Sequence, residues 1–281
     1  MKKLVFLVAV AGLMLLGVYV VSGSPKEEIS INPGKQLSLG GLEHAIKAFE
    51  AKTGVKVLIP KAGGCGDTVG GLDSGKLDAG AMCCPVNKDE SARNFVDVPV
   101  VRDALIFVVN KSNPVNNIST KQLRDIFQGR ITNWKEVGGK NASIQPYAHI
   151  MCGNREEVMR QFLVGERNYK KGIVGIDNSR FASNVINIKD EEHNCSKVAS
   201  DPNGIVPVSR SILNDSVKVI SVDGIMPTSG TIADGSYPVV RYLYITTKGY
   251  PSGHTRKFID FLKSSKGQAL LAKEGKLVPL P

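Results

Sequence analysis

The chain has 281 residues, of which 42% are hydrophobic and 6% aromatic, and its formal net charge is +10. This composition is typical of one large or two moderate globular domains and excludes a disordered chain. The positive charge is spread along the sequence without aromatic residues interleaved among the basic ones, so it indicates a solvated basic surface and no nucleic-acid partner.

The first 24 residues predict export from the cytoplasm. Residues 1–24 begin with two lysines, continue with an uncharged stretch from Leu4 to Val21 and end in small polar residues. This is the pattern of a signal peptide, but the apolar stretch is also about as long as the shortest segments that span a bilayer. We therefore expect either a cleaved signal peptide or an N-terminal membrane anchor, and a protein on the outer face of the cytoplasmic membrane or in the periplasm.

Short helices and strands alternate along the rest of the chain. Residues 42–53 predict an amphipathic helix that stops at Gly54, and residues 55–60 predict a strand directly after it. Further β-rich runs are VDVPVV, ALIFVVN, QPYAHIM, GIVPVS, VKVISVDG and VRYLYITT. The alternation predicts an α/β fold with largely parallel sheets.

Two extended, polar stretches with prolines, residues 108–114 and 221–230, bracket the middle of the chain. We interpret them as two linkers between a hinged pair of lobes. The first lobe would then comprise residues 29–110 and 223–281, and the second lobe residues 111–222.

The chain has five cysteines, an odd number that argues against complete disulfide pairing in an exported protein. Four of them follow predicted strands: Cys65 lies in a glycine-rich loop, Cys83 and Cys84 follow LDAGAM, and Cys152 follows QPYAHIM. In open α/β sheets, ligands bind beyond the carboxyl ends of strands, beside helix N-termini and glycine turns. The four cysteines are therefore candidates for one site.

Residues 103–139 and 223–245, together with the run PNGIVPVS, resemble the phosphate-binding proteins of ABC importers, a branch of the two-lobed periplasmic-type solute receptors. The resemblance covers nearly the whole chain after residue 30. It implies a periplasmic-binding-protein-like α/β fold with two lobes and a hinge, a small inorganic ligand, and the membrane subunits of an ABC importer as partners. An enzyme is not indicated, because the sequence has no catalytic metal motif and no nucleophile elbow.

The ligand motifs of that family are altered in this chain. In AGGCGDTVGGL, Cys65 stands at or beside a serine position, and in GAMCCP, Cys83 and Cys84 stand where the family's strand ends in aspartate or serine. In AHIMCGNRE, Cys152 replaces a serine, Asn154 replaces a threonine, and the motif's arginine is missing. The hydroxyl groups and the guanidinium that would hold phosphate are thus replaced mainly by thiols.

Thiolates prefer soft metals such as zinc and copper(I), or iron–sulfur clusters, over phosphate. Because four cysteines from different loops match the ligation of an iron–sulfur cluster, we predict a thiol-ligated metal species between the lobes, first an iron–sulfur cluster, with zinc or copper as other options. The predicted metal ligands are Cys65, Cys83, Cys84, Cys152 and, as an optional fifth, Cys195. The predicted further ligand-binding residues are Gly64, Gly66, Gly153 and Asn154.

Two alternatives to the metal site stay open on the sequence alone. The first is a receptor for a phosphate-type oxyanion or for arsenite, with its cysteines as free thiols or as disulfides, for example Cys65–Cys152 with Cys83 or Cys84 bonded to Cys195. The second is an extracytoplasmic thiol redox protein, for which no Cys-x-x-Cys motif is present.

Overall fold

The computed structural model describes residues 27–149, 162–163 and 181–281. The predicted signal peptide or anchor and the predicted site residues Cys152, Gly153 and Asn154 lie outside these ranges. Within the described ranges, none of the helices has the length and hydropathy that crossing a lipid bilayer requires.

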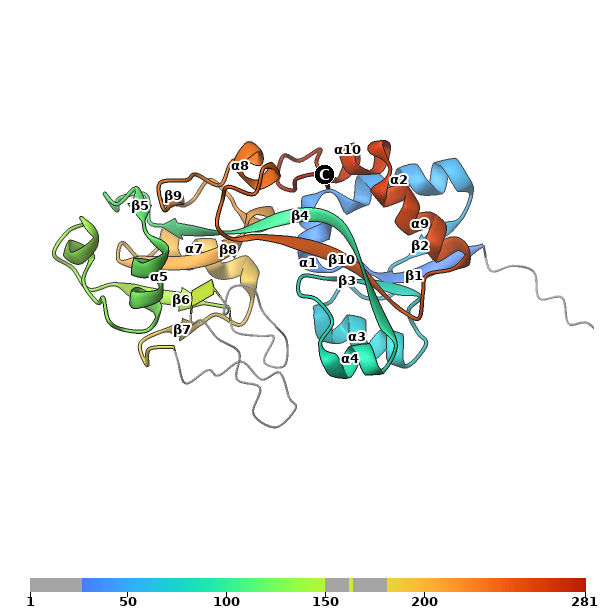
Figure 1. The fold of residues 1–281 in the computed structure, drawn as a ribbon, viewed down its shortest axis with the longest axis horizontal. Helices are drawn as coiled ribbons and strands as arrows, with labels where there is room; N and C mark the ends of the chain where they lie inside the picture. Colours follow the sequence, from blue (N-terminus) through green and yellow to red (C-terminus); the bar gives the residue numbers. More distant parts are fainter. Residues whose placement is uncertain (1–26, 150–161, 164–180) are drawn as a thin grey trace, which may run out of the picture.

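The described residues form short helices around one ten-stranded sheet (Figure 1). In chain order the elements are β1 (Glu28–Asn32), α1 (Lys35–Gly40), α2 (Leu42–Thr53), β2 (Lys56–Leu58), α3 (Cys65–Asp73), β3 (Ala79–Met82), α4 (Lys88–Ala92), β4 (Phe95–Val109), β5 (Asn117–Ile118), α5 (Thr120–Phe127), η1 (Trp134–Val137), β6 (Gln145–Ala148), β7 (Ile186–Asn187), η3 (Glu191–His193), α7 (Asn194–Ala199), β8 (Gly204–Ser209), η4 (Arg210–Ile212), β9 (Lys218–Val222), α8 (Ser229–Ala233), β10 (Val240–Lys248), α9 (Gly253–Lys263) and α10 (Ser265–Leu271), where η marks a 3-10 helix.

The sheet is mixed, not largely parallel as the sequence predicted. Its strand order is β2-β1-β3-β10-β4-β8-β6-β7, with β9 beside β4 and β5. The outer strands pair in parallel, as β1 does with β2 and β3, and β6 with β7 and β8. The central strands β4 and β10 instead pair antiparallel, because the chain crosses from the first lobe to the second along β4 and returns along β10.

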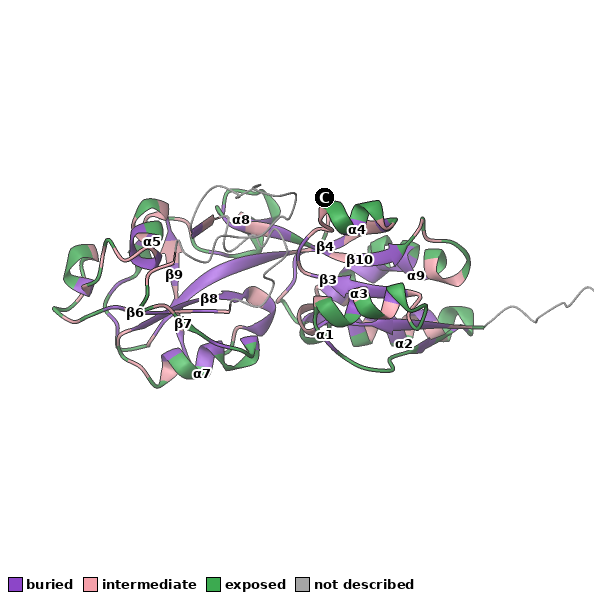
Figure 2. Cartoon of the chain, turned by 90° about the horizontal axis from the view of Figure 1, so that it is seen from below, coloured by how far each residue is buried: buried purple, intermediate pink, exposed green. Residues whose placement is uncertain are grey.

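Two hydrophobic cores lie at opposite ends of β4 and β10 (Figure 2). Along β4, Val101 belongs to the first core and Ala104 to the second. Along β10 the order is reversed: Val239, just before the strand, belongs to the second core, and Leu243 belongs to the first. The α/β two-lobed fold is therefore confirmed.

The predicted lobe boundaries at 110/111 and 222/223 both lie inside the second core. The runs VDVPVV and ALIFVVN were expected as separate strands, but they form the single 15-residue strand β4. The change of lobe consequently takes place in the middle of β4 and near the start of β10, and the two polar stretches belong to the second lobe.

Helix α2 agrees with the sequence prediction. Its apolar residues recur at helical spacing, and Leu42, Ala45, Ile46 and Phe49 are all buried. The Phe49 ring packs edge-on against Phe258 of α9, with 5.1 Å between the ring centroids. The helix therefore packs against α9 in the core of the first lobe.

Candidate functional site

Three cysteines of the first lobe lie in contact. Cys65 is the first residue of α3, and Cys83 and Cys84 directly follow β3. The Sγ atoms of Cys65 and Cys83 are 3.6 Å apart, and those of Cys83 and Cys84 are 3.8 Å apart. A disulfide bond is about 2.05 Å long, so both distances are those of thiols in contact and not of bridged sulfurs.

The three thiols differ in exposure. Cys65 and Cys83 are half-buried, whereas Cys84 is completely buried. The accessible part of the cluster is therefore the pair formed by Cys65 and Cys83, which two different elements provide.

The side chain of Asn32 holds these two elements together. Asn32 ends β1 and is 1% exposed, and its amide nitrogen donates to the carbonyl of Gly64 at 3.1 Å and to the Thr68 hydroxyl at 2.9 Å. Its carbonyl oxygen accepts from the N–H groups of Gly63 at 2.9 Å and Gly34 at 3.2 Å. Sequence reasoning missed this residue, although a polar residue between an apolar strand and Pro-Gly was a signal for such a role.

Thr68 extends the connection to β3, because its hydroxyl donates to the Ala81 carbonyl at 3.1 Å. Helix α3 lies so close to β3 at this point that a Cβ added at Gly80 would be 2.5 Å from Cγ2 of Thr68. The absence of a side chain at position 80 thus sets the distance between the helix that provides Cys65 and the strand that leads to Cys83.

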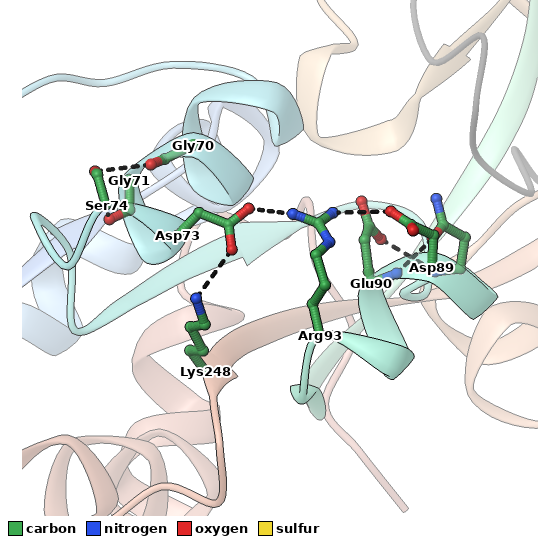
Figure 3. A network of polar contacts seen from close by, with 9 residues as sticks. Gly70, Gly71, Asp73, Ser74, Asp89, Glu90, Arg93 and Lys248 are labelled. Atoms are coloured by element: carbon green, nitrogen blue, oxygen red, sulfur yellow. Dashed lines mark hydrogen bonds and ion pairs between the residues drawn. The ribbon is translucent and has the colours of Figure 1, made fainter.

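The opposite end of α3 is held by ion pairs (Figure 3). Asp73 contacts Arg93, which follows α4, and the Nζ atom of Lys248 on β10 at 3.1 Å. Arg93 in turn lies 3.2 Å from Asp89 of α4. Both ends of the helix are therefore attached to the strands and helices around it.

Replacing Gly80 with alanine is expected to push α3 away from β3 and to cost about 1–3 kcal/mol of stability, because the added methyl group overlaps Thr68. Urea unfolding measures this cost, and the rate at which a mild oxidant joins Cys65 to Cys83 measures the separation of the thiols. Gly70→Ala is the control, since it lies on the exposed side of the same helix and its Cβ would meet no atom within 4 Å. Equal stability and equal oxidation rates in the two variants would contradict the proposed packing.

The start of α3 borders open space. Gly64 and Gly66, on either side of Cys65, are exposed, and a Cβ at either position would meet no atom within 4 Å. The nearby Asp67 carboxylate accepts hydrogen bonds from Lys61 at 2.8 Å and from the N–H of Gly64 at 3.0 Å. The bond from Lys61 holds the pKa of Asp67 below its ordinary value despite partial desolvation.

A buried ion pair lies at the crossing between the lobes, close to the thiols. Arg241 of β10 is opposite Asp103 of β4, and its Nε and Nη2 atoms are 2.9 and 2.8 Å from Oδ2 of Asp103. The same oxygen accepts from the hydroxyl of Ser209 at 2.8 Å. Burial opposes the charge on Arg241, but Asp103 and, more weakly, Cys83 and other nearby acidic groups hold its pKa above the ordinary value.

Contacts between α1 and η3 join the lobes a second time. Lys35 Nζ is 3.1 Å from a carboxylate oxygen of Glu192, and the side-chain amide of Gln36 donates to Glu191 at 2.5 Å. Glu191 also contributes to the electrostatic environment of Arg241, as Cys83 and Cys84 do. Cys83 and Cys84 of the first lobe and Glu191 of the second lobe thus all favour the charged form of the same guanidinium group.

Cys195 lies apart from the cluster. It is the second residue of α7, near a helix start as predicted, but it is fully buried in the core of the second lobe, where its thiol contacts the Ile212 carbonyl at 4.0 Å. Burial raises its pKa, which disfavours the thiolate that a metal requires. The alternative disulfide between Cys195 and Cys83 or Cys84 is not formed, and Cys83 belongs instead to the edge of the first core.

In the described ranges, no three or more His, Cys, Asp or Glu side chains are arranged to hold a metal ion. The contacts of Cys83 with Cys65 and Cys84 thus do not by themselves make a metal site within these ranges. Whether Cys152 adds a donor stays a prediction.

A sequence profile described as the PBP superfamily domain matches residues 27–266. The chain belongs to this superfamily. One relative is the phosphate-binding protein PstS of Bacillus subtilis, which is 27% identical over 224 residues, covering 78% of this chain and 70% of the relative. Another is Protein SphX of Synechococcus elongatus, which is 26% identical over 231 residues, covering 74% of this chain and 64% of the relative.

Solved structures of the superfamily agree with the fold. A protein from Clostridium perfringens, described as a phosphate ABC transporter substrate-binding protein with bound phosphate, is 26% identical and has a TM-score of 0.75, covering 90% of this chain and 100% of its own. An ABC-type phosphate transport receptor from Vibrio cholerae has a TM-score of 0.69 at 23% identity, over 90% and 100% of the two chains, and supports the fold alone.

Proposed function

We propose that this chain is the extracytoplasmic solute-binding component of an ABC importer and that its ligand is a small inorganic oxyanion or oxyacid. The observation that carries this proposal is the similarity, over 90% of the chain, to the Clostridium perfringens protein described with bound phosphate. The open glycine turn around Cys65 gives such a ligand access to backbone N–H groups at the start of α3.

A panel of ligands tests the proposal. The reduced protein, purified without oxygen, is unfolded by urea in the presence of phosphate, arsenate, sulfate or arsenite, with chloride at equal ionic strength as the control. A true ligand at a hundred times its dissociation constant is expected to add about 2.7 kcal/mol to the free energy of unfolding. If no member of the panel stabilises the protein more than chloride, the proposal is wrong.

A thiol-ligated metal species is the second candidate, and the contacts of Cys83 with Cys65 and Cys84 favour it. An iron–sulfur cluster needs four protein ligands, and in a two-iron cluster two of them bind the same iron. The three thiols in contact are one fewer than a cluster requires, so a cluster would need a further ligand, for which Cys152 is the candidate. Visible absorption together with iron, zinc, copper and sulfide analysis of the anaerobic protein tests this candidate, and a colourless, metal-free protein would exclude it.

A further inference from the structure

We propose that Cys65 and Cys83 form a dithiol site for a trivalent arsenic or antimony oxyacid, with arsenite as the probe of this class. The inference rests on the proposed function and names the class of solute. Four features of the described residues support it: the distance between the sulfurs, their access to solvent, the number of donors and the pairing of nearby charges.

The distance between the two sulfurs fits a bent bridge through one atom. We take about 2.3 Å for each bond between sulfur and the bridging atom, as in a metal–thiolate bond. Two sulfurs bound to one atom in a straight line would then be about 4.6 Å apart. The 3.6 Å between the sulfurs of Cys65 and Cys83 instead corresponds to an angle of roughly 100° at the bridging atom. A trivalent arsenic atom, which carries a lone pair and forms three bonds in a pyramid, has such an angle. A metal ion with two thiolates in line does not match this separation.

The pair is also accessible and held in place. Cys65 and Cys83 are half-buried and lie beside the exposed Gly64 and Gly66, whereas Cys84 and Cys195 are fully buried. Because the hydrogen bonds of Asn32 fix α3 against β1, the two thiols are brought together before any ligand binds. Preorganisation of this kind lowers the entropic cost of binding.

The number of donors favours a ligand that two thiols satisfy. A structural zinc site needs four ligands, whereas the described residues contain no group of three or more His, Cys, Asp or Glu side chains that could hold a metal ion. Arsenous acid needs only two: As(OH)₃ + 2 RSH → (RS)₂As–OH + 2 H₂O. Two S–H bonds and two As–O bonds are broken, two As–S bonds and two water molecules form, and arsenic stays trivalent, so no oxidant or reductant takes part.

The charges around the pair suit a neutral oxyacid. Lys61 is already paired with Asp67, and Arg241 with Asp103. A phosphate dianion near Cys65 would approach the Asp67 carboxylate, whereas arsenous acid is uncharged at neutral pH and meets no such repulsion. The two thiols thus bind the neutral ligand covalently and reversibly.

Calorimetric titration tests the inference on the full chain, purified anaerobically and kept reduced with a phosphine. Arsenite is expected to bind with one equivalent per chain. Cys65→Ser and Cys83→Ser are each expected to weaken binding by about 10²-fold or more, because each removes the advantage of chelation, and the matched control Cys195→Ser is expected to bind like the wild type.

A second measurement needs no variant. Phenylarsine oxide, a probe for paired thiols, is expected to protect Cys65 and Cys83 of the wild-type protein from alkylation, as followed by peptide mass spectrometry. Phosphate binding without arsenite binding would overturn the dithiol site and leave the proposed receptor function intact. Binding of neither ligand, with no other oxyanion of the panel bound, would overturn both. Unchanged arsenite affinity in the two serine variants, or equal protection of all cysteines, would also contradict the site.

Discussion

Replacing Asp103 with alanine is expected to lower the free energy of unfolding by about 3–5 kcal/mol, because it leaves the buried charge of Arg241 without its partner. Oδ2 of Asp103 accepts one hydrogen bond from Nε of Arg241, which lies on β10. It accepts a second from the hydroxyl of Ser209, which ends β8. The substitution therefore removes the polar connection among three strands where the lobes meet.

Urea unfolding, followed by circular dichroism, measures this effect. Asp260→Ala is the matched control, since it removes a carboxylate that pairs with Arg256 four residues earlier on the exposed surface of α9, where such a pair contributes about 0.3–0.5 kcal/mol. A loss in Asp103→Ala no larger than that of the control would show that the buried pair does not hold the crossing together.

Replacing Asn32 with leucine is expected to cost about 3 kcal/mol or more, since it leaves the buried N–H groups of Gly34 and Gly63 without their acceptor. Leucine has nearly the shape of asparagine, so the cost reports the hydrogen bonds more than the packing. The start of α3 is expected to loosen as well, and the yield of the Cys65–Cys83 disulfide on mild oxidation should fall.

The control for Asn32→Leu is Asn141→Leu, which removes an exposed side chain that accepts one hydrogen bond, from Asn133 at 2.9 Å. Its effect is expected to stay within about 0.5 kcal/mol. If the variant at position 32 unfolds at the same urea concentration as the control and forms the disulfide at the same rate as the wild type, Asn32 does not position the thiols.

Local patterns in the sequence predicted α2 and β3, but they placed Cys65 in a glycine-rich loop, whereas it begins α3. The helical spacing of apolar residues indicated α2, and the apolar run before Cys83 indicated β3, so both cysteines were expected at a strand end. The meeting of Cys65 with Cys83 then follows from the general rule that strand ends share one edge of a sheet.

Features that depend on distant pairing were not predictable in the same way. Strand direction is set by the partner strand, and the antiparallel pairing of β4 with β10 joins residues far apart in the sequence. The burial of Cys195 was missed because Asn-Cys-Ser has the composition of an exposed helix start. Arg241 and Asp103 did carry a signal, since each places a charge inside a β-rich run, and such charges are commonly paired when buried.

The most direct test is a crystal structure of the reduced protein grown with arsenite, with anomalous scattering used to locate arsenic. We predict one strong peak between the Sγ atoms of Cys65 and Cys83, at bonding distance of about 2.3 Å from each. An anomalous map without arsenic at these sulfurs, or with arsenic bound only at other residues, would contradict the dithiol site.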